Sequence, residues 1–185
     1  LLKQVTPVLR RLRVKQPNLR IFVPLGAATL AGRADMARLT DILDQDGDVA
    51  AGIVFEITQE TLGNLGTSGI ESLAELGRLG ATMGLSNVMA AGLDLGSLRQ
   101  LGVRFLSIGA ASIDSGFGLS SARREFTQYA RALQFQIIAS GISAAPQATA
   151  ATQIARFGCG PFFAPPRKVR NDAGAAAGQH RTQAA

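Results

Sequence analysis

Four polar side chains, Glu56, Ser86, Ser107 and Ser140, each stand at or near the end of a different apolar segment. If these segments are parallel strands of a barrel, the four positions converge on one mouth, where such barrels bind their ligands. A carboxylate and three hydroxyl groups can hydrogen-bond a polar ligand, and they can equally bond to one another or to water. The sequence therefore predicts a polar pocket at the strand ends.

Residue counts exclude several other chemistries. The single cysteine, Cys159, allows no internal disulfide and favours a reducing compartment, which we expect to be the cytoplasm. The single histidine, His180, stands in an Ala/Gly/Gln-rich segment, so we expect neither a His/Cys zinc site nor a Ser-His-Asp triad in the core. Since Cys159 lacks a histidine partner, we interpret it as a small packed side chain rather than a nucleophile.

The elements that would position these side chains alternate between strand-like and helical segments. Strands are predicted at 20–25, 52–57, 82–85, 103–108, 135–139 and 160–164. Such an alternation predicts an α/β fold with a parallel sheet, either doubly wound or closed as a (β/α) barrel. No Gly-x-Gly-x-x-Gly follows the first strand and no P-loop sequence occurs, so the barrel is the favoured architecture.

The helical segments carry apolar residues at helical spacing, which we interpret as stripes that face the core. A capping box of Ser68 and Glu71 is expected to begin one helix, and Gly80 to end it. Pro146 is expected to open a helix that runs to about residue 157. The stripes are Met36, Leu39, Ile42 and Leu43; Ile70, Leu73, Leu76 and Leu79; Leu93, Leu95, Leu98 and Leu101; and Phe126, Tyr129, Ala130 and Leu133.

The net charge of +6 is concentrated at the two ends of the sequence. Residues 1–20 contain six basic residues and no acidic one, whereas residues 21–165 contain nine arginines and twelve acidic residues. Terminal basic residues mostly lie on solvated surfaces, and no RNA- or DNA-binding motif occurs, so we expect no nucleic-acid partner. We also expect no membrane span within the chain, and a disordered basic tail rich in Ala, Gly and Gln over residues 171–185.

Five blocks of the sequence resemble, in order and spacing, the EAL domain, the family of bacterial cyclic-di-GMP phosphodiesterases. They are 54–59 (VFEITQ), 76–89 (LGRLGATMGLSNVM), 98–109 (LRQLGVRFLSIG), 137–143 (IIASGIS) and 159–166 (CGPFFAPP). The resemblance implies a modified TIM-like (β/α) barrel of the EAL type over residues 1–170. It also implies that the family's first strand, which carries the Glu-Ala-Leu triplet, is missing from this chain.

Active members of the family hold two divalent metal ions, and this chain departs from their pattern at most of the corresponding positions. The resemblance puts Pro24 where the family has a metal-binding Asn, Ser86 and Asn87 where it has two adjacent Asp, Ser107 where it has the catalytic Lys, Ser140 where it has a Glu and Cys159 where it has a Gln. Glu56 alone keeps a metal-ligand identity. Because Mg²⁺ and Mn²⁺ are bound mainly by carboxylates, we expect no metal, no cofactor and no phosphodiesterase activity.

The residues that remain at the mouth form the candidate ligand site, namely Glu56, Ser86, Asn87, Ser107 and Ser140. The ligand that the resemblance implies is cyclic-di-GMP, bound without metal-dependent hydrolysis. Glu56 has a second interpretation, because a lone acid there could form an ion pair with an arginine at the mouth such as Arg104.

Degenerate domains that resemble this family commonly act as cyclic-di-GMP receptors or as protein docking modules. The leading hypothesis is a receptor that regulates a protein partner; the alternatives are a docking domain independent of nucleotide and a residual phosphodiesterase. Residues 162–170 resemble the ending of the TipF type, polar regulators of flagellum assembly. That resemblance implies a flagellar or polar partner, and membrane association at the cell pole only through a segment upstream of this chain.

Overall fold

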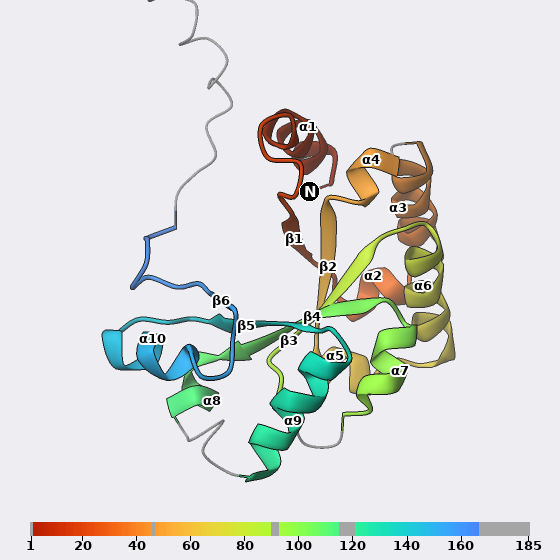
Figure 1. The fold of residues 1–185 in the computed structure, drawn as a ribbon. Coiled ribbons are helices and arrows are strands. Elements are labelled where there is room, and N and C mark those ends of the chain that lie inside the picture. Colours follow the sequence, from red (N-terminus) through yellow and green to blue (C-terminus); the bar gives the residue numbers. More distant parts are fainter. Residues whose placement is uncertain (1, 46, 90–92, 115–120, 167–185) are drawn as a thin grey trace, which may run out of the picture.

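A parallel sheet organises the part of the chain that the computed structural model describes, which comprises residues 2–45, 47–89, 93–114 and 121–166. Its six strands are hydrogen-bonded to one another in chain order, and each neighbouring pair is parallel. The strands are β1 (Ile21–Pro24), β2 (Ile53–Thr58), β3 (Thr82–Ser86), β4 (Val103–Gly109), β5 (Gln136–Ser140) and β6 (Phe157–Gly158), as Figure 1 shows.

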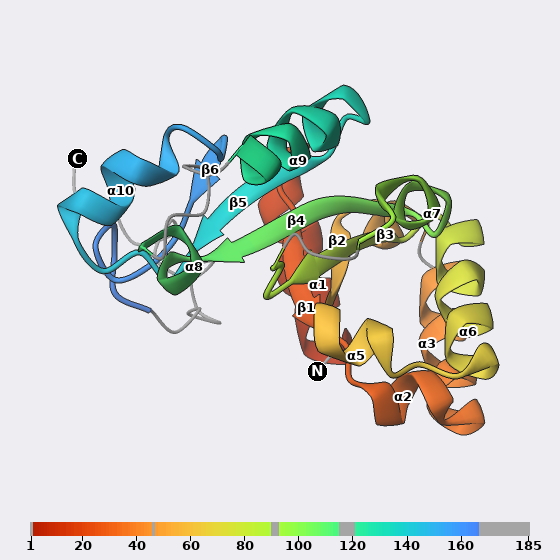
Figure 2. The same cartoon turned by 90° about the horizontal axis from the view of Figure 1, so that it is seen from below.

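Helices connect the strands and cover the convex side of the sheet, which curls into a half-barrel (Figure 2). The predicted α/β class and TIM-like curl are therefore confirmed, and within the described residues the sheet remains open between β1 and β6. The helices are α1 (Leu2–Arg13), α2 (Ala27–Ala31), α3 (Arg33–Gln45), α4 (Gly47–Ala50), α5 (Gln59–Gly63), α6 (Thr67–Arg78), α7 (Leu95–Gln100), α8 (Ala110–Asp114), α9 (Ser121–Ala132) and α10 (Ala145–Ala151).

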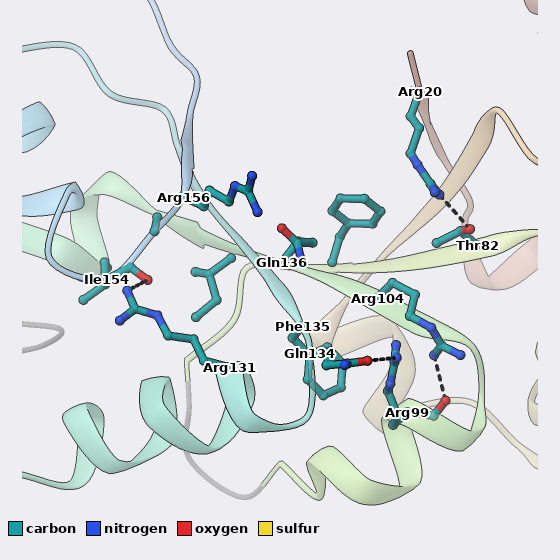
Figure 3. A pocket seen from close by; sticks show the side chains of 13 residues that line it. Arg20, Thr82, Arg99, Arg104, Arg131, Gln134, Phe135, Gln136, Ile154 and Arg156 are labelled. Atoms are coloured by element: carbon teal, nitrogen blue, oxygen red, sulfur yellow. Dashed lines mark hydrogen bonds between the residues drawn. The ribbon is translucent and has the colours of Figure 1, made fainter. Parts of the chain in front are cut away.

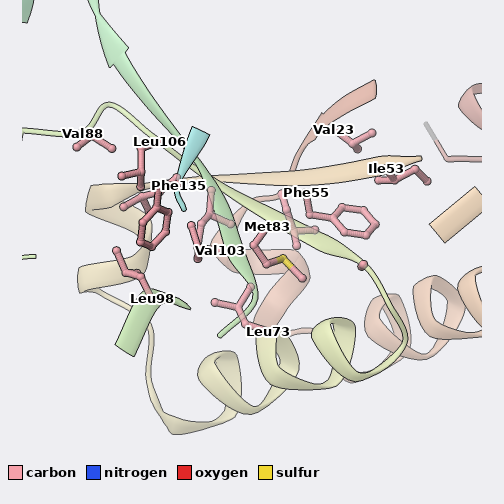
Figure 4. Packing of buried hydrophobic residues seen from close by; sticks show 14 of the residues in the cluster. Val23, Ile53, Phe55, Leu73, Met83, Val88, Leu98, Val103, Leu106 and Phe135 are labelled. Carbon is pink, nitrogen blue, oxygen red and sulfur yellow. The ribbon is translucent and has the colours of Figure 1, made fainter. Parts of the chain in front are cut away.

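The hydrophobic core lies between the sheet and these outer helices (Figure 4). Successive strand side chains point to opposite faces, so Ile53, Phe55 and Ile57 of β2 enter the core while Glu56 points to the concave side. Leu73 and Leu76 of α6 meet this layer and are almost completely buried. The alternation assigns one face of each strand to packing and leaves the other face free to line a site.

The predicted capping box of α6 is wrong. The N-cap is Gly66 rather than Ser68, and its backbone begins the helix without a side-chain hydrogen bond. Ser68 instead lies within the first turn and is exposed. The predicted end is confirmed, because Gly80 follows the helix with a φ of +84°, a left-handed conformation that glycine adopts without steric cost.

The C-terminal elements differ from the prediction in two places. Helix α10 ends at Ala151, since the chain turns there and the guanidinium of Arg131 donates to the Gln153 and Ile154 carbonyls at 3.3 and 3.1 Å. The last strand is the short β6 rather than 160–164, because Gly160 has a φ of +150° and Pro161 has no amide hydrogen to donate. Beyond β6 the chain instead follows the end of β5, where the Phe162 amide donates to the Ile142 carbonyl at 3.0 Å.

The apolar stripe predicted for α9 is confirmed except at Tyr129, because Phe126, Ala130 and Leu133 pack in or against the core. Thr127 and Ala130 are buried, whereas Tyr129 is 56% exposed. The helix therefore turns its Thr127 side toward the sheet and leaves the tyrosine ring at the flank, a rotation that the spacing of apolar residues did not fix.

Two expectations concern segments at the limits of the described chain. The predicted tail over 171–185 and the last residues of the predicted 1–170 domain lie outside the described residues, so these boundaries stay predictions. No helix within the described ranges combines the length and the apolar character needed to cross a membrane.

Candidate functional site

The strands β2 to β5 bring all five predicted site residues to one groove of about 970 Å³ on the concave side of the sheet. Glu56 comes from β2, Ser86 and Asn87 from the end of β3, Ser107 from β4 and Ser140 from the end of β5. The predicted convergence of these side chains is therefore confirmed, while their role in ligand binding stays a prediction.

Aromatic and amide side chains complete the walls of the groove. Phe22 of β1 and Phe105 of β4 pack edge to face, with ring centroids 5.2 Å apart and an interplanar angle of 78°, and Gln136 and Ile138 come from β5. Gly84 lies between them, where a Cβ atom would come within 3.2 Å of Val54 Cγ1 and 3.7 Å of the Phe22 ring. The concave side of the sheet is thus closely packed around Gly84, and the groove opens toward the carboxyl ends of the strands.

Sequence reasoning missed these wall residues although a signal for them was present. Phe105 precedes Ser107 by two positions, and Gln136 and Ile138 precede Ser140 by four and two positions. Side chains two positions apart on a strand share a face, so each predicted serine also identifies the wall residues below it.

Two of the serines are held by neighbouring strands rather than by one another. The Ser86 hydroxyl donates to the Ile57 carbonyl of β2 at 3.3 Å, and the Ser140 hydroxyl donates to the Ile108 carbonyl of β4 at 3.4 Å. Each hydroxyl oxygen keeps its acceptor capacity toward the groove. The two hydroxyl groups are thus fixed in position, and their oxygens can still accept a hydrogen bond from a ligand.

The remaining three polar groups have no side-chain hydrogen bond or ion pair within the described part of the chain. They are the carboxylate of Glu56, the amide of Asn87 and the hydroxyl of Ser107, which is 6% exposed. Asn87 has a φ of +54°, a conformation that Asn tolerates better than most residues, and this bend carries its side chain to the groove at the end of β3. Ser107 is buried, Glu56 is half-buried and Asn87 is exposed, and each of these groups is available to a ligand in the groove.

The alternative ion pair between Glu56 and Arg104 is contradicted. Arg104 lies near the start of β4, and its Nη1 donates to the Arg99 and Val103 carbonyls at 2.8 and 2.9 Å. Glu56 has no cationic partner among the described residues, and burial raises the pKa of its carboxyl above its usual value. The carboxylate therefore lies in the groove without an ion-pair partner among the described residues.

Cys159 is exposed and lines the groove, so its interpretation as a packed side chain is wrong. The adjacent backbone explains this position, because the Cys159 amide donates to the Ala139 carbonyl at 2.9 Å and extends the pairing with β5. The groove also contains two guanidinium groups, Arg20 and Arg156, which directly precede β1 and β6. Sequence analysis did not single out either arginine.

The donor set of the groove does not fit the two-metal centre that the fold family implies. Among the described residues, no group of three His, Cys, Asp or Glu side chains is placed to hold a metal ion. Glu56 is the one carboxylate among the residues that line the groove, and its other oxygen donors are hydroxyl and amide groups. Hard dications such as Mg²⁺ take several carboxylate or water oxygens, which a single carboxylate does not supply.

Solved structures of EAL proteins have the same fold. The EAL enzyme Bd1971 in its cAMP-bound form matches with a TM-score of 0.70 at 20% identity, over 89% of this chain and 46% of that chain. The PaMucR phosphodiesterase in complex with c-di-GMP matches with a TM-score of 0.69 at 17% identity, over 89% of this chain and 75% of that chain.

A third structure is the FimX EAL domain of Xanthomonas citri in complex with c-diGMP, with a TM-score of 0.69, 14% identity and coverage of 89% of this chain and 68% of that chain. The chain thus spans about half the length of Bd1971 and more of the other two. No curated protein matches the sequence. The family model of the EAL domain matches residues 1–166, nearly the whole chain, and the chain therefore belongs to the EAL domain family.

Proposed function

We propose that this chain is a catalytically inactive EAL domain that binds cyclic-di-GMP in the groove and thereby regulates a protein partner. The observation that carries the proposal is the composition of that groove. It joins hydroxyl and amide groups, aromatic rings and two arginines around a single carboxylate. These groups suit the recognition of a dinucleotide and do not suit the metal-dependent activation of water.

The groove offers a partner for each part of a cyclic dinucleotide. Arg20 and Arg156 are placed to form charge-assisted hydrogen bonds with phosphate oxygens. The rings of Phe22, Phe105 and Phe157 line the same space and can stack on guanine bases, whose edges the free amide and hydroxyl groups can hydrogen-bond. Structures of the PaMucR phosphodiesterase and the Xanthomonas citri FimX EAL domain hold this dinucleotide, which supports the choice of ligand.

The proposed catalytic inactivity is supported by the groups that the groove lacks among its described residues. Hydrolysis by the family needs two metal ions that activate a water molecule, and Glu56 is the single carboxylate available to them here. Ser107 stands where the family has its catalytic lysine, and a hydroxyl carries no positive charge to stabilise a developing negative one. Binding without turnover is the activity that these residues support.

A receptor must bind its ligand with different affinity in two states of the protein, or with and without its partner. We propose that the partner belongs to the machinery of polar flagellum assembly, supported by the resemblance of residues 162–170 to the TipF ending. Association with the membrane at the cell pole would come from a part of the protein upstream of residue 1.

The proposal is tested by calorimetric titration of cyclic-di-GMP into the protein, with Mg²⁺ and separately with EDTA. Saturable binding at micromolar or lower concentration that is unchanged by EDTA is expected, with no linear dinucleotide formed over hours. The variant Ser140→Leu, which fills the groove at the end of β5, should weaken binding at least about tenfold, the loss expected when a ligand's hydrogen bonds are blocked. The control Ser68→Leu, an exposed position on α6, should bind as the unmodified protein does.

Two outcomes contradict this proposal. Metal-dependent formation of the linear dinucleotide that is lost in Glu56→Ala would show a residual phosphodiesterase. A protein that is folded by circular dichroism yet gives neither heat nor a thermal shift would be a docking domain that works without nucleotide, and the search would then turn to its protein partners.

A further inference from the structure

A second pocket, of about 800 Å³, adjoins the groove on the side where the strands begin, and Figure 3 shows the side chains that line it. We call it the arginine pocket, because five arginines line it. Arg20 and Arg156 directly precede β1 and β6, and Arg104 is the second residue of β4. The other two stand in the last turns of helices, Arg99 on α7 and Arg131 on α9. Elements far apart in the sequence thus bring five positive charges together around one pocket.

The charge of the arginine pocket is not balanced by acidic side chains. Its described lining contains no Asp or Glu. Two ion pairs of the described residues, Arg38 with Asp35 and Arg78 with Glu75, lie on α3 and α6, away from this pocket. Since the helix dipole favours cations in the last turn of a helix, it accounts in part for Arg99 and Arg131, but not for the convergence of all five.

Neutral oxygens and rings hold the guanidinium groups in place. Arg20 donates to the Thr82 hydroxyl at 3.0 Å, and Arg99 donates to the Gln134 side-chain oxygen at 3.5 Å. Arg104 and Arg131 donate to backbone carbonyls, as described above. Arg20 also lies over the Phe105 ring, 5.6 Å from its centroid. These contacts use few of the five N–H donors that each guanidinium carries, so most donors remain free.

Two further features show that the surrounding protein groups do not fully satisfy these guanidinium groups. The Nη1 atom of Arg99 is buried and has no hydrogen-bond partner among the described residues. Burial and the nearby charge of Arg99 together lower the pKa of Arg104, which means that the positive form is disfavoured there. A buried donor without a partner costs free energy, and an anion in the pocket would remove that cost.

We propose that the arginine pocket binds a small ligand that carries two or more adjacent phosphate groups. Guanidinium forks match phosphate oxygens in pairs, and five of them exceed what one singly charged anion can neutralise. The volume lies in the range of small-molecule sites, and Phe105, Gln134 and Gln136 supply a ring and two amides for the non-phosphate part. Arg99, Arg104 and Arg131 distinguish this pocket from the proposed cyclic-di-GMP groove, and the two adjoining cavities share Arg20, Phe105, Gln136 and Arg156.

The test uses inorganic tripolyphosphate as the probe, titrated calorimetrically into the protein at low and at physiological ionic strength. One saturable site per chain is expected, with binding that weakens as salt is added because the interaction is between charges. The double variant Arg99→Gln/Arg104→Gln should bind at least about tenfold more weakly, as expected for losing charged hydrogen bonds. The control Arg33→Gln/Arg38→Gln removes the same charge from α3 and should change the affinity less than about twofold, because distant exposed charges are screened.

A second variant keeps the test decisive if the double variant does not fold. The guanidinium of Arg99 donates to the Gln134 side chain and not to a backbone carbonyl of the described residues, so Arg99→Gln alone leaves the backbone contacts intact. This variant should still weaken tripolyphosphate binding several-fold. Both variants should bind cyclic-di-GMP as the unmodified protein does, which separates this pocket from the groove.

Three results would overturn the proposal: no binding of tripolyphosphate by the folded protein, an equal loss in the α3 control, or tighter binding of a poly-glutamate peptide than of tripolyphosphate. The second would indicate nonspecific charge attraction, and the third would indicate a docking surface for an acidic protein segment.

Discussion

At the scale of single residues, Glu56 is a carboxylate whose environment disfavours its charged form. Glu56 forms no ion pair among the described residues, and burial raises the pKa of its carboxyl. A raised pKa in the folded state means that the unfolded chain gives up this proton more easily. The charged carboxylate therefore lowers the stability of the fold, and its retention is consistent with a role toward a ligand.

The variant Glu56→Gln tests this interpretation. At a pH below the pKa that Glu56 has in the unfolded chain, the carboxyl is protonated in both the folded and the unfolded state. The wild-type protein and Glu56→Gln should therefore be equally stable at about pH 3. As the pH rises through the folded pKa, the wild-type protein loses stability and the variant does not. Thermal unfolding at pH 7 should consequently give a higher Tm for Glu56→Gln.

The matched control for this comparison is Glu125→Gln on the exposed side of α9, which should leave the Tm at pH 7 nearly unchanged. A Glu56→Gln variant that is less stable than the wild-type protein at neutral pH would show that the carboxylate has a stabilising partner.

At the scale of elements, the path of the chain after β6 depends on one glycine, Gly160. Gly160 has a φ of +150°, and a Cβ atom added there would collide with the backbone of Ile142. This close approach lets the chain continue along the end of β5 and places Cys159 in the groove. No other residue type fits that contact without displacing the backbone.

Gly160→Ala should therefore destabilise the protein, by roughly 1–3 kcal/mol, the usual cost of backbone strain at one residue. Gly63→Ala, at the end of α5 with no atom within 4 Å of its Cβ position, is the control. It should be neutral or stabilising by up to about 1 kcal/mol, since alanine is the better helix former. Urea unfolding measures both, and equal effects of the two substitutions would contradict the account of the Ile142 contact.

At the scale of the whole molecule, the open half-barrel divides the strands into edge and interior ones. Strands β1 and β6 each pair on one side among the described residues, whereas β3 and β4 are paired on both sides and covered by the outer helices. Unpaired edges open more easily than central strands, because fewer hydrogen bonds and contacts must break.

Native-state hydrogen exchange should show this order directly. The amides of β3 and β4 should exchange slowest, near the rate set by global unfolding, and those of β1 and β6 should exchange through local opening. Protection in β6 equal to that in β4 would show that a further segment or a second molecule covers the edge.

Much of the fold and of the groove could be predicted from the sequence, because both depend on residue patterns within short segments and on the order of those segments along the chain. Short apolar, strand-like segments located five of the six strands, and parallel strands bring their carboxyl ends to the same edge of the sheet. Glu56, Ser86, Asn87, Ser107 and Ser140 consequently share a groove, as predicted.

Other features were decided by the tertiary structure, since they depend on contacts between distant residues. The sixth strand follows from pairing with β5 rather than from its own residues, and the rotation of α9 that exposes Tyr129 follows from packing on the sheet. Periodicity could not show that Glu56 lacks a partner, because Arg104 is held at the far end of β4 by carbonyls.

What the sequence by itself determined is the alternation of elements and the residue types at the strand ends. What only the tertiary structure decided is which charges meet. The sequence places Arg20, Arg99, Arg104, Arg131 and Arg156 in separate segments, and the curl of the sheet collects them into one pocket. Electrostatic interactions depend on distance in space rather than along the chain, so the second site became visible only in the folded molecule.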